Sequence, residues 1–260
     1  MNNYNYFNFP VEIIKDYLDN PIGVLDDIFD YALWNYAKEA YIDDNINDKF
    51  SQKDCERYNI DLSIDEDDLD EEEYEMLLDM QRLRLAEKKF EVITGNVNRS
   101  IERGKELVNR YNYSKAPFSN ISTEIWFEYY KKEKTEWENI MLLAFLAVRS
   151  IIGEKGYCKI TNDFLFARMC GLRTKIKNKK ELNKTVQKYY TEYYKNKIRT
   201  ELELYWHLKT YNGRGYYASF DMEYKDLIRA IKLNSKTNRM KVLAREKKAI
   251  AKEIDLELNK

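Results

Sequence analysis

The sequence predicts a mainly helical protein with one small antiparallel β-hairpin in its C-terminal half. The 260 residues include only 3 Pro and 8 Gly, and Lys, Glu and Leu, which favour helices, are abundant. Residues 135–152 form an apolar stretch with almost no polar face, typical of a buried helix. Residues 206–220 contain two strand-like runs around the turn sequence NGRG. We predict a helical N-terminal domain over residues 1–116, a hairpin-containing domain over 117–235 and a basic tail over 236–260, with Pro117 at the main boundary.

The N-terminal domain should begin with a short helix over residues 11–18, followed by a longer one. Asn20 is a suitable N-cap and Pro21 a suitable first helical residue. The apolar side chains that follow recur at helical spacing: Ile22, Leu25, Phe29, Ala32, Leu33 and Tyr36. We expect this helix to end near Tyr41.

An acidic segment over residues 43–75 interrupts this pattern. Nine of the eleven residues from Asp65 to Glu75 are acidic, and we expect the end of the segment to open a helix, because carboxylates favour helix N-termini. A magnesium site is the alternative, and a solvated acidic face is the interpretation we favour. Residues 85–111 then read either as a helix-turn-helix with its turn at Gly95 or as a plain helical hairpin.

The second domain should be built around the apolar helix. Ser122 or Thr123 is expected to cap a helix before it, and the sequence GYCKIT after it reads as a short strand. Thr161 or Asn162 should cap the next helix, within which Ala167 and Gly171 have the four-residue spacing of a close helix crossing and a turn.

A further helix over residues 191–206 should precede the hairpin. Its inward face carries Ile198, Leu202 and Trp206, and we expect Lys195, Asn196, Arg199 and Glu203 to project outward. Trp206 and Leu208 are expected on one face of the first strand. Tyr216, Ala218 and Phe220 should share a face of the second strand. A packing helix over 222–233, with Tyr224, Leu227, Ile228 and Ile231 inward, should follow.

This order of helix, short strand, helix, turn, helix and hairpin resembles the winged helix-turn-helix superfamily. Over residues 135–232 the chain looks most like the DNA-binding modules of plasmid and phage replication initiators and of phage regulators. The resemblance implies a recognition helix at 191–206 that meets duplex DNA and a wing with Arg214 at its tip. The chain departs from the family pattern in the long basic segment that follows Gly171.

The charge distribution also indicates a polyanionic partner. Residues 41–80 carry 16 acidic and 3 basic side chains, whereas residues 171–260 carry 23 basic and 11 acidic ones. The candidate nucleic-acid-binding residues are Arg173, Lys175, Lys177, Lys179, Lys180, Lys188, Lys195, Asn196, Arg199, Lys209 and Arg214. Tyrosines at 189, 190, 193 and 194 raise the alternative of stacking on unpaired bases, although we expect Tyr190 and Tyr194 to be core residues.

The sequence offers little for an enzyme, a cofactor or a metal. His207, the only histidine, is expected within a strand, and no Walker A or GxGxxG motif is present. Cys55, Cys158 and Cys170 lack metal-binding spacing and read as reduced thiols, which favours a cytoplasmic protein. The longest apolar run, residues 140–148, is too short for a membrane span. We therefore expect no catalytic residues, no cofactor and no membrane partner.

Three functions fit these observations. The first is a non-enzymatic regulator of replication or transcription from a phage or mobile element, which binds duplex DNA or RNA through a winged helix. The second is an inhibitor of a host nucleoprotein defence machine, of the anti-CRISPR type, which binds guide RNA or the effector protein. The third is a structural phage protein. The charge polarity of the chain motivates the second, whose acidic segment 61–75 would imitate phosphates.

Overall fold

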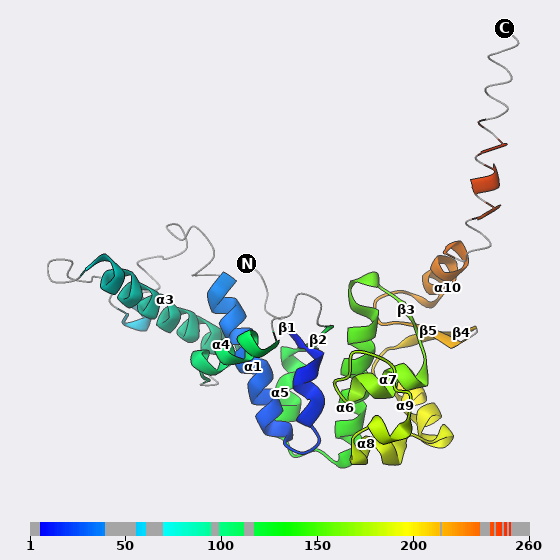
Figure 1. Cartoon of the computed structure of the whole chain (residues 1–260), viewed down its shortest axis with the longest axis horizontal. Coiled ribbons are helices and arrows are strands. Elements are labelled where there is room, and N and C mark those ends of the chain that lie inside the picture. The colour runs from blue at the N-terminus through cyan, green and yellow to red at the C-terminus, as the bar shows by residue number, and fades with distance from the viewer. Residues whose placement is uncertain are drawn as a thin grey trace, which may run out of the picture.

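A computed structural model confirms a mainly helical chain with small antiparallel sheets (Figure 1). The structure describes residues 6–39, 56–60, 70–94, 99–111, 117–213 and 215–234, together with 240–241, 243–245, 247–248 and 250. Among these residues, no helix combines the length and the apolar character needed to cross a membrane.

The N-terminal region is assembled on helix α1 (Pro21–Ala37). Asn20 caps it as predicted, because its side chain accepts a hydrogen bond from the Gly23 amide, and the helix ends slightly earlier than expected. Helices α3 (Glu71–Thr94) and α4 (Ile101–Tyr111) both pack against α1. The expected short helix is the 3₁₀ helix η1 (Val11–Asp16). The turn at Gly95 and residues 61–69 of the acidic segment lie outside the described residues.

A two-stranded sheet that the sequence did not reveal links the two halves of the chain. Strand β1 (Tyr6–Pro10) pairs antiparallel with β2 (Phe118–Ser122), with Phe7 opposite Ile121. Phe7 and Phe9 are fully buried, and one continuous cluster of buried side chains runs from Phe7 to Ala218. The domain boundary at 116/117 stays a prediction, and this sheet crosses it.

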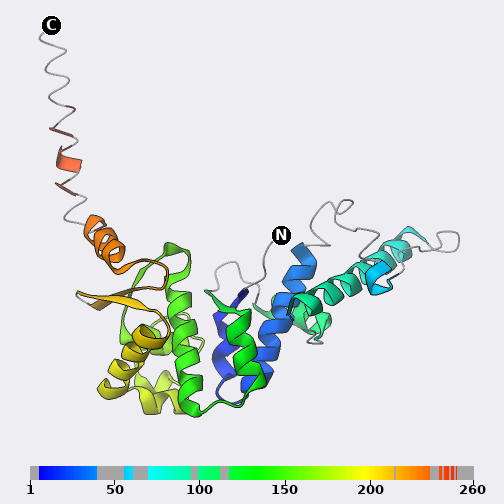
Figure 2. The same cartoon turned by 180° about the vertical axis from the view of Figure 1, so that it is seen from behind.

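The C-terminal half surrounds helix α6 (Glu136–Ile152), which is buried along most of its length. Before it lies α5 (Thr123–Lys131), capped by Ser122. After it, in chain order, come η5 (Gly153–Lys155), β3 (Cys158–Ile160), α7 (Asn162–Met169), η6 (Lys179–Glu181), α8 (Lys184–Tyr189), α9 (Glu192–Tyr205), β4 (Lys209–Gly213), β5 (Gly215–Ser219) and α10 (Tyr224–Leu233). The three strands form an antiparallel sheet in the order β3-β5-β4. Both views show α3 and the β4–β5 hairpin extending from opposite ends of the molecule, with α6 between them (Figures 1 and 2).

Three expectations about the hairpin and the helix after it are wrong. Trp206 caps the C-terminus of α9 instead of starting a strand, because the amides of both Trp206 and Leu208 donate to the Leu202 carbonyl. This turn places His207 at a positive φ of 58°, between helix and strand, so the histidine is not a strand residue. Tyr224 is 50% exposed at the start of α10 and does not face inward, whereas Leu227 is fully buried. Tyr216 and Ala218 of β5 are buried together, as predicted.

Candidate nucleic-acid interface

The basic segment, defined here as residues 173–184, leaves the core at the turn after α7. Ala167 is fully buried, and Gly171 adopts a φ of 72°, which an L side chain rarely tolerates. A Cβ added at Gly171 would lie 3.3 Å from the Val11 carbonyl oxygen of η1. Ala167 and Gly171 therefore act as the predicted small residue and turn residue. They let the chain turn closely against η1 before the lysines begin.

The backbone of the basic segment is held in place at several points. Ile176 and Leu182 within it, and Val186 just beyond it, are buried apolar anchors. The Glu181 carboxylate accepts hydrogen bonds from the amides of Lys177 and Asn178, at 3.1 and 2.9 Å. Because these contacts already order the backbone in the free protein, the segment loses less conformational entropy when it binds a partner.

The lysines of this segment are exposed and form no ion pair with any residue of the described ranges: Lys175, Lys177, Lys179, Lys180 and Lys184. The first four were predicted as binding residues. Lys184, the first residue of α8, was missed, although its sequence neighbourhood carried the same signal. Arg173, also predicted, is partly neutralised because its guanidinium pairs with Glu12 of η1.

Helix α9 handles its charges differently, because its cations are paired with acids of the same helix. The ion pairs are Lys195 with Glu192 at 2.7 Å, Lys197 with Glu201 at 3.8 Å, and Arg199 with Glu203 at 3.9 Å. These acids lie three or four positions from the cations they neutralise, where helical side chains meet.

The outward projection expected for Lys195 is wrong. Its Nζ lies 4.0 Å from the centroid of the Tyr190 ring, and only 12% of the side chain is exposed, because the alkyl stem covers the aromatic surface. Arg199 is also held, since it donates a hydrogen bond of 3.4 Å to the Asn212 side chain. Asn196 is exposed, as predicted.

The remaining predicted residues lie outside the basic segment. Lys188 of α8 pairs with Glu136 at 3.5 Å. Lys209 is half-buried at the start of β4. Arg214, the expected wing tip, lies outside the described residues. The structure therefore leaves the lysines from Lys175 to Lys184 exposed on one segment, whereas Lys188, Lys195 and Arg199 are paired with neighbouring acids.

The clustered tyrosines mostly serve the fold. The Tyr189 hydroxyl donates to Glu136 at 2.7 Å, and partial burial with the nearby Glu136 carboxylate raises the Tyr189 pKa to about 12. Tyr190 donates to Asp163 and packs edge-on against Phe166 at 5.1 Å. Tyr194 lies 5.8 Å from the Trp137 ring. Tyr193, 68% exposed, is the one member of this group with a largely open ring.

No group of three or more potential His, Cys, Asp or Glu metal ligands occurs within the part of the chain that the structure describes. The two cysteines in that part, Cys158 and Cys170, are free thiols. Comparisons with protein-family models, with curated proteins and with solved structures find no match for this chain. The interface must therefore be judged by its own geometry.

Proposed function

We propose that this chain is a non-enzymatic nucleic-acid-binding protein whose C-terminal half is a winged helix-turn-helix. The topology supports this proposal, since α6, β3, α7, α9 and the β4–β5 hairpin follow one another in the order of that fold, with β5 central in the sheet. Control of replication or transcription is the role we propose for it.

The observation that carries the proposal is a set of lysines that form no ion pair with another described residue, on a backbone already held in position. Lys175, Lys177, Lys179, Lys180 and Lys184 can neutralise phosphates and release condensed counterions, which favours binding whatever the base sequence. Glu181 and the buried Ile176 and Leu182 reduce the entropy lost when the segment docks.

Duplex DNA is the ligand we favour. Single-stranded binders stack bases on open aromatic rings, whereas Tyr189, Tyr190 and Tyr194 are engaged within the protein. On α9, the exposed Asn196 and Thr200 are of the types that contact base edges in a major groove. In this proposal the basic segment positions the protein through phosphates, and α9 supplies base contacts.

The first test replaces Lys175, Lys177, Lys179 and Lys180 together by Gln. Binding to a labelled duplex is measured by fluorescence anisotropy over a salt series. We expect the slope of log K against log salt to fall by about 3 to 4, since each lost phosphate contact removes about 0.9. The matched control replaces exposed Lys105, Lys131, Lys132 and Lys155, which changes the net charge equally and should leave the slope almost unchanged.

The same assay separates the basic segment from α9. Lys195→Gln with Arg199→Gln should alter the slope by well under about 1, because Glu192 and Glu203 already neutralise these cations. An unchanged slope in the four-lysine variant would contradict the proposed interface. Tighter binding to RNA or single-stranded DNA than to any duplex would contradict the choice of ligand, and absence of binding to all three would contradict the function.

A further inference from the structure

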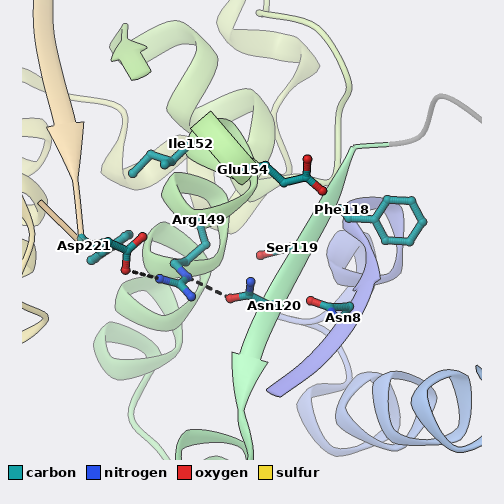
Figure 3. A pocket seen from close by; sticks show the side chains of 10 residues that line it. Asn8, Phe118, Ser119, Asn120, Arg149, Ile152, Glu154 and Asp221 are labelled. Carbon is teal, nitrogen blue, oxygen red and sulfur yellow. Dashed lines mark hydrogen bonds and ion pairs between the residues drawn. The ribbon is translucent and has the colours of Figure 1, made fainter. Parts of the chain in front are cut away.

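A second candidate site, away from the basic segment, is a pocket between the β1–β2 sheet and the C-terminal end of α6 (Figure 3). Its volume is about 480 Å³, within the range of small-molecule sites. Asn8 and Asn120 contribute from the two strands, Arg149 from the last turns of α6, and Asp221 from the residues after β5. The pocket is therefore built from segments far apart in sequence, at the junction of the two halves of the chain.

Arg149 is held in a defined orientation in this pocket. Its Nε donates a hydrogen bond of 2.8 Å to the Asn120 side-chain oxygen. The guanidinium carbon lies 5.5 Å from the Phe220 ring centroid and 5.8 Å from that of Tyr6. A guanidinium carries five N–H groups, and among the residues that the structure describes the Nε hydrogen bond is supplemented only by an ion-pair contact of 3.6 Å from Nη1 to Asp221. The Nη edge therefore retains donors suited to a bidentate carboxylate.

The other charges of the pocket select the kind of anion. Asp221 and Glu154 also line it, so that the lining has two acids for one cation. This balance disfavours a simple anion such as phosphate, which would meet uncompensated negative charge. A ligand that carries its own cation next to its carboxylate can pair with Arg149 and with an acid of the lining at the same time. The Asp221 carboxylate is suited to the cation, because it is 68% exposed on its side chain and lies beside the Arg149 fork.

We propose that this pocket binds a free α-amino acid. The ligand carboxylate pairs with the Nη edge of Arg149, and its ammonium group is accepted by Asp221, which lies beside that guanidinium. Its side chain packs along Ile152 and Phe118, the apolar part of the lining. This site goes beyond the nucleic-acid-binding function proposed above and does not depend on it.

The test is calorimetric titration of the full chain, without nucleic acid, with each of the common amino acids at up to about 10 mM, which detects dissociation constants in the millimolar range. We expect at least one to bind saturably. Its N-acetyl and carboxamide derivatives, which lack the cation and the anion respectively, should each bind at least about 10-fold more weakly. Arg149→Gln should weaken binding by about 10- to 100-fold, whereas Lys155→Gln, on the adjacent exposed turn, should not.

A second variant guards against misfolding of Arg149→Gln. Asn8→Trp, at an exposed position of β1, fills the pocket and leaves Arg149 in place, so it should also abolish binding while far-UV circular dichroism stays unchanged. Absence of saturable binding by any amino acid would overturn the proposal. So would binding of inorganic phosphate alone, equal affinity for the N-acetyl derivative, or full affinity in Asn8→Trp.

Discussion

Two regions of the molecule use charged side chains in opposite ways. Between α1 and α4, Arg103 makes two hydrogen bonds to Asp27, at 3.0 and 3.3 Å, and Arg99 pairs with Asp26. In the same place Asp30, only 5% exposed, accepts a hydrogen bond from the Ser100 amide. In the basic segment, by contrast, five lysines are exposed and none is paired with another described residue.

This difference separates charged side chains that stabilise the fold from charged side chains that remain available to bind a partner. Removing a charge from water costs free energy unless partners replace the lost hydration. The Arg103–Asp27 pair meets that condition, whereas the buried Asp30 meets it only in part and its pKa is raised. The lysines of the basic segment keep their hydration, so they contribute little to folding and can exchange water for phosphate. Helix α9 lies between these extremes, because its cations are near the surface yet neutralised by its own acids.

The largest expected effect comes from separating α4 from α1 without touching a charge. A Cβ added at Gly104 would lie 2.1 Å from the Asp30 carbonyl oxygen and 2.8 Å from Trp34 Cβ. Gly104→Ala should therefore lower the free energy of unfolding by about 3 kcal/mol or more, although alanine is the better helix former. Chemical denaturation measures this change.

The control for this prediction is Lys105→Ala, on the exposed side of the same helix, which should change the stability by less than about 0.5 kcal/mol. Where Gly104→Ala remains folded, its salt slope for DNA should equal that of the unmodified chain. A stability loss as small as that of Lys105→Ala would show that close packing of α4 on α1 is not required.

The next effect concerns pH and again isolates the α1–α4 region. Burial raises the pKa of Asp30 to about 7, against the smaller lowering effects of the Ser100 amide and Arg99. The folded state therefore holds this proton up to about pH 7, whereas the unfolded chain releases it near pH 4. Stability should fall as the pH rises from about 4 to 7, and Asp30→Asn should remove that part of the dependence.

Denaturation of both proteins over this pH range measures the effect. Above pH 7 we expect Asp30→Asn to be the more stable protein, by on the order of 2 kcal/mol, since its neutral amide can still accept from Ser100. At pH 4 the two should differ little. Parallel pH profiles would mean that the Asp30 carboxyl is not held in its neutral form by the fold.

The parts of the fold that the sequence predicted depend on near neighbours. The caps at Asn20, Ser122 and Thr161 follow from side chains that accept hydrogen bonds from amides three residues further on. The ion pair between Lys195 and Glu192 could also have been predicted from the sequence, because side chains three residues apart on a helix are adjacent.

The parts that escaped prediction require contacts between distant segments. Strand β1 pairs with β2 although more than a hundred residues separate them in the sequence. Neither five-residue strand is followed by a turn motif that would indicate its partner. The Arg149 pocket depends on this pairing, since Asn8 and Asn120 face one another in its register. The binding candidates from Lys175 to Lys180 were predicted by composition. That they form no ion pair with another described residue became visible only in the structure.

The smallest expected effect tests whether the basic segment acts as an ordered unit. Glu181→Ala and Glu181→Gln remove the same charge, but only alanine also removes the acceptor for the Lys177 and Asn178 amides. Relative to Glu181→Gln, Glu181→Ala should lower the free energy of unfolding by about 1 kcal/mol. It should also weaken duplex binding by about threefold, because a looser segment loses more conformational entropy when it binds. Denaturation and anisotropy on the two variants measure both quantities. Equal duplex affinities of the two variants, despite the lower stability of Glu181→Ala, would mean that the lysines act as independent mobile charges. The basic segment would then resemble a flexible basic tail more than the α1–α4 region with its fixed ion pairs.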